Sequence, residues 1–215
     1  MFGRVELLVG PAGRCVRRVA CGNGWPLTRL IARLLQRRER RALVVLAGCA
    51  AVPQLLAGDC AGAGELLRTW CDGEPLWSVR ELRQDFFDRL REVVIAVHAR
   101  QVCHNDLHKE NNILVGPDGH PRLVDFQLAS VHPRGGARFR RRCAEDLRHV
   151  EKHRRRYEPE QPVRAPAPRS LAARLWRRCV KPIYNVVTRR ILRLQRGEPR
   201  RPPDAPLPVR TPPRD

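Results

Sequence analysis

The chain has 215 residues, and its 42 Lys and Arg against 22 Asp and Glu give a formal net charge of +20. This length accommodates one domain, or one domain with a tail, and excludes a large multidomain architecture. The basic excess is uneven, because residues 138–215 carry 23 Lys and Arg but only 8 Asp and Glu. Such a surplus indicates a surface for an anionic partner, which can be a membrane lipid, a nucleic acid or an acidic substrate.

Eight cysteines lie at irregular intervals without any Cys-x-x-Cys pair. This pattern predicts buried free thiols rather than disulfides or a zinc site. Two histidine pairs have the i, i+4 spacing of a helix face, His104 with His108 and His149 with His153. Neither pair has a cysteine or acidic partner at ligand spacing, so we predict no zinc there.

The N-terminal residues lack the charged-then-apolar layout of a signal peptide. The longest apolar run, residues 42–58, is interrupted by Pro53 and Gln54 and is too short to cross a bilayer. We therefore expect a cytoplasmic protein.

The first third of the chain reads as strands around one helix. Residues 5–9 and 14–19 predict two strands joined by a glycine-containing turn. Residues 27–46 place apolar side chains at helical spacing with arginines on the other face, which predicts an amphipathic helix. A loop over residues 46–56 leads into a strand, and residues 65–70 predict another strand.

The following segment is more helical. Apolar residues at helical spacing predict a long amphipathic helix over residues 79–100. Residues 112–115 and 122–125 predict two short strands, joined by the turn Gly116-Pro117-Asp118-Gly119. A further helix opens at residue 145 and ends before Pro159.

The C-terminal region changes composition. Residues 159–169 predict a proline-rich linker, and residues 170–196 predict two short basic amphipathic helices separated at Pro182. Those helices can lie on an anionic membrane surface or dock on the core of the domain. Residues 197–215 are rich in proline and arginine and predict a disordered tail.

The most informative stretch is His104-Asn105-Asp106-Leu107, followed by Asn111 and by Asp125-Phe126-Gln127. Asp106 and Asn111 are five residues apart, and Asp125 follows fourteen residues later. This order is similar to the His-Arg-Asp-Leu-(three)-Asn and Asp-Phe-Gly motifs of the protein-kinase-like superfamily. The sequence resembles most closely its small bacterial members, the lipopolysaccharide Kdo-kinase and RIO-like group.

The resemblance implies an α+β fold, a minimal protein-kinase-like domain over residues 1–158. A small antiparallel sheet lobe would end near residue 70, and a reduced helical lobe would cover residues 71–158. Asp106 would be the catalytic base, while Asn111 and Asp125 would hold the Mg²⁺, or Mn²⁺, that bridges the ATP phosphates.

Two kinase elements depart from the pattern. No glycine-rich loop is present, and no lysine precedes Lys109, so Arg18 stands where the phosphate-binding lysine is expected. Glu39 stands where the helix glutamate would pair with that residue. Both side chains can equally be solvated residues on a strand and on a helix face. The resemblance assigns the adenine-binding hinge to the backbone of Arg68, Thr69 and Trp70, although Trp70 can equally be a core residue.

These observations favour an ATP- and Mg-dependent phosphotransferase, a serine/threonine protein kinase or a Kdo-type sugar kinase. Its acceptor would be a hydroxyl of a protein or of lipopolysaccharide, and residues 170–196 could hold it peripherally at the inner membrane. A catalytically weak pseudokinase or scaffold is the alternative, because the lysine and the glycine-rich loop are missing. No motif indicates specific nucleic-acid binding.

Overall fold

The computed structural model describes residues 4–10, 13–21, 26–56, 65–160, 202 and 205–212. The basic helices predicted over residues 170–196, and nearly all of the linker before them, lie outside these ranges.

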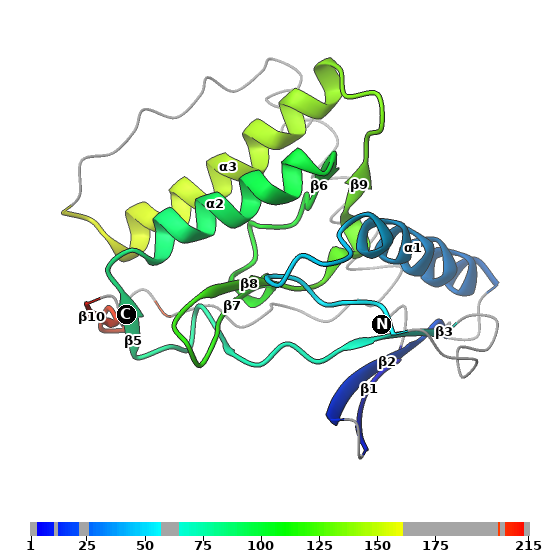
Figure 1. Ribbon diagram of the computed structural model, residues 1–215, viewed down its shortest axis with the longest axis horizontal. Coiled ribbons are helices and arrows are strands. Elements are labelled where there is room, and N and C mark those ends of the chain that lie inside the picture. Colours follow the sequence, from blue (N-terminus) through cyan, green and yellow to red (C-terminus); the bar gives the residue numbers. More distant parts are fainter. Residues whose placement is uncertain are drawn as a thin grey trace.

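One end of the molecule is a small antiparallel sheet with one helix beside it (Figure 1). The strands β1 (Arg4–Gly10), β2 (Gly13–Val19) and β3 (Glu65–Thr69) lie in that order, and the helix is α1 (Pro26–Val45). The predicted hairpin and helix are therefore confirmed. Gly13 has φ +106, a conformation that side chains other than glycine rarely adopt, and this allows the β1–β2 turn.

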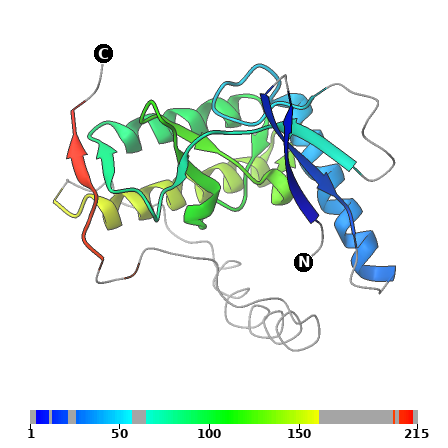
Figure 2. The same cartoon turned by 90° about the horizontal axis from the view of Figure 1, so that it is seen from below.

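Two long helices form the other part of the fold. Helices α2 (Phe86–Ala99) and α3 (Ala137–Tyr157) lie side by side in both views (Figures 1 and 2). The apolar face of α2 is buried, and the Phe87 ring lies 5.9 Å from the Tyr157 ring of α3. The buried α2 side chains at helical spacing are Phe86, Phe87, Leu90, Val94 and Val97. Their removal from water is the main stabilising contribution to this packing.

Short strands connect these two parts. Strands β4 (Glu74–Pro75), β7 (Ile113–Val115) and β8 (Pro121–Leu123) form an antiparallel sheet in the order β4-β7-β8. The hairpin predicted around Gly116–Gly119 is therefore confirmed. A second pair joins β6 (Val102–Cys103) to β9 (Ser130–Val131). Two 3₁₀ turns, η1 (Glu110–Asn112) and η2 (Phe126–Leu128), flank the hairpin and carry the candidate site.

The helix predicted from residue 79 begins later, at Phe86. Residues Glu81–Arg83 instead form a strand, β5, which pairs in parallel with β10 (Val209–Thr211). The disorder predicted for residues 197–215 is thus wrong for β10. Its Arg210 donates a 2.6 Å hydrogen bond to the Gln84 carbonyl oxygen and also pairs with Glu158. The exposed edge of β5 supplies partners that the local composition of the tail does not reveal.

Helix α3 begins at Ala137, eight residues before the predicted start. Its first two turns are rich in arginine, and Glu145 and Asp146, with which the predicted helix opens, come after them. Tertiary contacts account for the extension, since Phe139 packs near His98 and His132. The helix ends at Tyr157, just before Pro159, as predicted.

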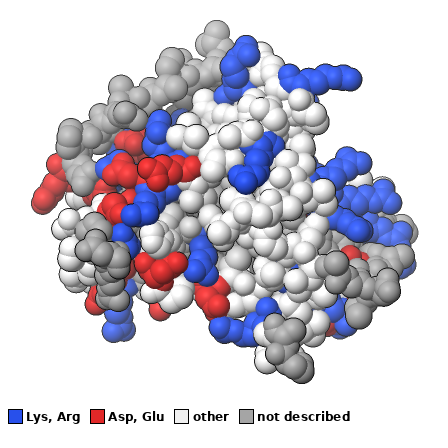
Figure 3. All heavy atoms as spheres, viewed as in Figure 1, with Lys and Arg blue, Asp and Glu red and all other residues white. Residues whose placement is uncertain are grey.

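Charge is segregated on the surface. In Figure 3 the Lys and Arg side chains gather over the end of the molecule that contains α1, and acidic side chains gather at the opposite end. The exposed arginines of α1 are Arg29, Arg33, Arg37, Arg38, Arg40 and Arg41. Within the described part of the chain, no helix has the length and apolar content needed to span a bilayer.

Candidate active site

The loop that carries Asp106 is held from beneath by Asp146 of α3. The Asp146 carboxylate is 1% exposed, and it accepts hydrogen bonds from the backbone N–H of His104 (2.8 Å) and of Asn105 (2.9 Å). The His98 Nε2 lies 3.2 Å from the same carboxylate. A buried acceptor that serves two consecutive N–H groups fixes the course of the backbone from His104 into Asn105.

Asn105 adopts a left-handed conformation, with φ 64. Its amide nitrogen donates to the Leu128 carbonyl oxygen (2.8 Å) and to the Ser130 Oγ (3.0 Å), and its amide oxygen accepts from Arg142 (2.6 Å). Asparagine tolerates this backbone better than most residues. These contacts couple the Asp106 loop to the segment that follows Asp125.

The carboxylate of Asp106 is 2% exposed and surrounded by donors. Its Oδ2 accepts from the Asn112 amide at 3.0 Å and lies 3.1 Å from the Lys109 Nζ. The His108 Nδ1 lies 3.1 Å from Oδ1, which has no other hydrogen-bond partner among the described residues. Burial favours the protonated acid, but His108 and Lys109 outweigh it, so the pKa of Asp106 is lowered. Asp106 is therefore ionised at neutral pH and can accept a proton at Oδ1.

The structure brings Asn112, and not Asn111, to Asp106. The buried Asn112 amide nitrogen donates to both the backbone oxygen (3.1 Å) and the Oδ2 (3.0 Å) of Asp106. Its amide oxygen is then the atom left to accept a cation. Asn111 is half-buried on the same 3₁₀ turn, one residue out of register with this contact. The geometry thus favours Asn112 as the amide ligand in place of the predicted Asn111.

Asp125 is brought beside Asn112 through the backbone. The Val124 N–H donates to the Asn112 carbonyl oxygen at 3.0 Å, which ties the turn before β7 to the end of β8. Asp125 itself is left-handed, with φ 65 and ψ 65, and its side chain is one-third exposed. The Gln127 amide donates to Asp125 Oδ1 at 2.5 Å, and Arg18 lies 3.7 Å from the same atom. A carboxylate and an amide oxygen form the hard donor set that Mg²⁺ prefers.

Glu39 of α1 is buried between two arginines. Its Oε2 lies 2.6 Å from Arg18 of β2, and its Oε1 lies 3.3 Å from Arg68 of β3. Glu39 is 1% exposed, so its charge depends on these partners. The structure therefore brings together the predicted pair Arg18 and Glu39, and it places Arg18 between Glu39 and Asp125.

The three residues predicted to bind adenine make different contacts within the protein. The Thr69 N–H donates to the Gln54 carbonyl oxygen (2.8 Å), and the Trp70 N–H donates to the Arg14 carbonyl oxygen (3.2 Å). The Arg68 side chain is part of the Glu39 cluster. The backbone N–H groups of Thr69 and Trp70 thus already donate to carbonyl oxygens of the protein, and this geometry does not support an adenine contact through them.

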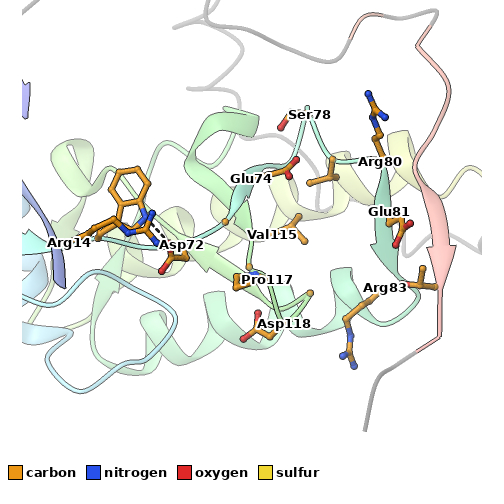
Figure 4. Close-up of a pocket in the computed structure, with 16 residues that line it drawn as sticks. Arg14, Asp72, Glu74, Ser78, Arg80, Glu81, Arg83, Val115, Pro117 and Asp118 are labelled. Atoms are coloured by element: carbon orange, nitrogen blue, oxygen red, sulfur yellow. Dashed lines mark hydrogen bonds and ion pairs between the residues drawn. The ribbon is translucent and has the colours of Figure 1, made fainter. Parts of the chain in front are cut away.

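A cavity of about 920 Å³ lies between the β7–β8 turn and β5 (Figure 4). Figure 4 shows Arg14 and Asp72 at one end of the cavity and Arg80, Glu81 and Arg83 at the other. Arg18, Asp106 and Asp125 do not line it. It is therefore separate from the candidate active site.

Comparisons with known proteins concern the fold of the chain. The chain is 33% identical over 153 residues to calcium-dependent protein kinase 9 of Oryza sativa subsp. japonica, covering 65% of this chain and 26% of that protein. Its structure is similar to the Rio2 kinase of Chaetomium thermophilum, with a TM-score of 0.59 and 14% identity, covering 77% of this chain and 57% of the other. No family model matches the chain. The chain thus spans about a quarter and just over half the length of these two proteins.

The fold is a reduced protein-kinase-like fold, as predicted, with a small antiparallel sheet and three α-helices in the described residues. The printed names of both similar proteins are those of kinases, and the structural similarity to the Rio2 kinase supports the protein-kinase-like fold of this chain. The resemblance to RIO-like proteins has a structural counterpart, whereas the Kdo-kinase resemblance stays a prediction.

Sequence reasoning missed Asn112, Lys109 and Gln127 as site residues. Asn112 was hidden because two asparagines are adjacent and only one of them matches the five-residue spacing from Asp106. The predicted strand began at residue 112 and so placed Asn111 directly before it, whereas β7 begins at Ile113 and Asn112 is the residue directly before it. Lys109 is the only lysine in the first 151 residues, and it lies within the motif itself.

We predict that Asp146→Asn destabilises the protein by about 3 kcal/mol, because an amide cannot accept both backbone hydrogen bonds and leaves a buried N–H group unpaired. Urea denaturation measures the change in the free energy of unfolding. The matched control is Glu145→Gln, one residue away on the same helix, where the side chain is exposed. Equal stability of the two variants would contradict the assigned role of Asp146.

The pKa of His149 is lowered to about 4 by burial and by the nearby Arg148. Glu145 acts in the opposite sense, while His108 and His153 add to the lowering. The imidazole is thus neutral in the folded protein, whereas the unfolded chain takes up a proton below its ordinary pKa of about 6.5. Stability due to this group is complete at pH 7 and is lost as the pH falls from about 6.5 toward 4.

We therefore expect the difference in unfolding free energy between pH 7 and pH 5 to shrink by about 2 kcal/mol in His149→Gln relative to the wild type. Urea denaturation at both pH values gives the two differences. The same pH dependence in both proteins would show that His149 is not buried as a neutral group.

Proposed function

We propose that the protein is an ATP- and Mg²⁺-dependent phosphotransferase that moves the γ-phosphoryl group of ATP to a hydroxyl. The observation that carries this proposal is the contact between Asp106 and Asn112. A buried, ionised carboxylate is bound by an amide whose oxygen is left for a cation. Asp125 directly follows Val124, whose backbone N–H donates to the Asn112 backbone carbonyl oxygen, so the two candidate ligands lie on neighbouring backbone segments.

Each residue has a role that its position supports. Asp106 accepts the proton of the acceptor hydroxyl. The hydroxyl oxygen forms a bond to the γ-phosphorus, and the bond between that phosphorus and the bridging oxygen of ADP breaks. Asn112 and Asp125 would hold Mg²⁺, which would neutralise charge on the phosphates. Lys109, 3.1 Å from Asp106, places a cation where the transferred group would lie.

Arg18 takes the position of the missing lysine. It is oriented by Glu39 at 2.6 Å and lies 3.7 Å from Asp125, so its guanidinium faces the proposed phosphate site. Arginine binds phosphate oxygens through a planar fork and keeps its charge when partly buried. This arrangement supports phosphate binding without a lysine in β2.

We propose a serine or threonine hydroxyl of a protein as the acceptor. The similarity to a plant protein kinase supports this choice over a lipopolysaccharide sugar hydroxyl. Assays with a protein acceptor and with a lipopolysaccharide sugar acceptor distinguish protein phosphorylation from sugar phosphorylation. Peripheral membrane association through residues 170–196 stays a proposal from the sequence.

A pseudokinase is the second candidate, and the contacts of Arg18 favour it. A guanidinium already paired with Glu39 and close to Asp125 can occupy the phosphate site electrostatically rather than bind a nucleotide. The two candidates differ in chemistry, because only the enzyme transfers phosphate when ATP and Mg²⁺ are supplied.

We expect Asp106→Asn to lower the rate of phosphoryl transfer by roughly 10²–10⁴-fold, because the amide cannot accept the proton. Asn112→Ala should lower it comparably, since the metal ligand and the Asp106 contact are both lost. Asn111→Ala is the matched control and should retain most activity. The measurement is transfer of radiolabelled γ-phosphate to the protein itself and to a serine/threonine peptide library.

Circular dichroism of each variant shows whether the fold is kept. Full activity of Asp106→Asn would remove the assignment of the base. Loss of activity in Asn111→Ala with activity retained in Asn112→Ala would reverse the assignment of the amide ligand. Absence of any transfer by the wild-type protein would favour the pseudokinase.

A further inference from the structure

Three side chains with metal-binding atoms meet beneath the Asp106 loop. They are His98 at the end of α2, Cys103 of β6 and Cys143 of α3, and their ligand atoms all lie within 4.8 Å of one another. His98 and Cys103 are buried, and Cys143 is half-buried. None of the three has a role in the proposed transfer reaction, so this cluster is a separate feature.

The separation of the two sulfurs fits a shared cation. Cys103 Sγ and Cys143 Sγ are 3.7 Å apart. Two thiolates bound to one tetrahedral Zn²⁺, with Zn–S bonds of about 2.3 Å, lie roughly 3.8 Å apart. A disulfide would require about 2.05 Å. The sulfurs therefore have the spacing of zinc ligands without any movement of the backbone.

The charges of the cluster also fit. Two thiolates and one neutral imidazole around Zn²⁺ carry no net charge, which suits a buried position.

We propose that His98, Cys103 and Cys143 form a structural zinc site. The Phe139 carbonyl oxygen, 4.0 Å from Cys103 Sγ, or a water molecule completes the tetrahedron. His98 has two ring nitrogens, so one can bind zinc while Nε2 keeps its contact with Asp146 at 3.2 Å. A carboxylate behind a zinc-binding histidine is a recurrent arrangement that fixes the ring orientation.

Such a site would clamp three elements at the base of the catalytic loop. Cys103 directly precedes His104, and Cys143 lies one turn before Asp146 on α3. Zinc would thus stabilise the same junction that the Asp146 carboxylate stabilises. The sequence did not reveal the site because its ligands lie on three different elements and the two cysteines are 40 positions apart.

The test is zinc binding by the full chain. Elemental analysis of protein purified without chelators should find about one zinc ion per chain. Cobalt(II) added to chelator-treated protein should give thiolate-to-cobalt charge-transfer absorption. Cys143→Ser should lose the zinc and this absorption. Its zinc affinity should fall by more than roughly 10–100-fold, which is the loss expected when only a residue that hydrogen-bonds to a zinc ligand is removed.

Cys15→Ser is the matched control, because Cys15 is also half-buried but lies on β2 outside the cluster. It should bind zinc as the wild type does. The cobalt absorption of the wild-type protein does not depend on any variant. Its absence therefore overturns the proposal even if Cys143→Ser fails to fold. Retention of zinc by a folded Cys143→Ser, or a Cys103–Cys143 disulfide detected by mass spectrometry in the purified protein, also overturns it.

Discussion

The buried carboxylate of Asp146 is the constraint on which the candidate site depends. It accepts hydrogen bonds from the backbone N–H groups of His104 and Asn105, and Asn105 itself takes a left-handed conformation. That conformation is unfavourable for most residues and persists only when its surroundings fix it. Asp106 follows directly, so the direction of its side chain is set by α3, an element 40 residues further along the chain.

A second constraint links the sheet to the loops. Glu39 is buried between Arg18 and Arg68, which lie on adjacent strands, and Arg18 reaches toward Asp125. One carboxylate thereby positions two cations, one of which faces the proposed phosphate site. In addition, Arg38 of α1 donates to the Ala129 (3.3 Å) and Leu128 (3.1 Å) carbonyl oxygens that follow Asp125. The position of α1 therefore controls both the Arg18 side and the Asp125 side of the site.

The sequence predicted the local elements well where periodicity or turns determine them. The β1–β2 hairpin, α1 and the β7–β8 hairpin follow from alternation, helical spacing and glycine turns. It failed where a distant segment decides the structure. Residues 81–83 form a strand because β10 pairs with them, and no property of residues 79–85 alone indicates that partner. The early start of α3 is likewise a result of tertiary packing.

The candidate site shows the same division. The motif and its spacing predicted Asp106 and Asp125, and the kinase resemblance predicted that Arg18 and Glu39 would pair. The five-residue spacing selected Asn111, and only the contact with Asp106 in three dimensions favours its neighbour Asn112. The hinge residues were assigned by position along the chain. Their backbone hydrogen bonds within the sheet could not be read from the sequence.

The central claim is that Asn112 and Asp125 together bind a metal–nucleotide complex beside Asp106. The most direct measurement is the thermal stability of the wild type and of Asp125→Asn with a non-hydrolysable ATP analogue, with and without Mg²⁺. Asparagine keeps the left-handed backbone but removes the charge. The account predicts Mg²⁺-dependent stabilisation of the wild type, about 2.7 kcal/mol at one hundred times the dissociation constant, and its loss in the variant. Equal stabilisation of both proteins, or none of the wild type, would contradict it.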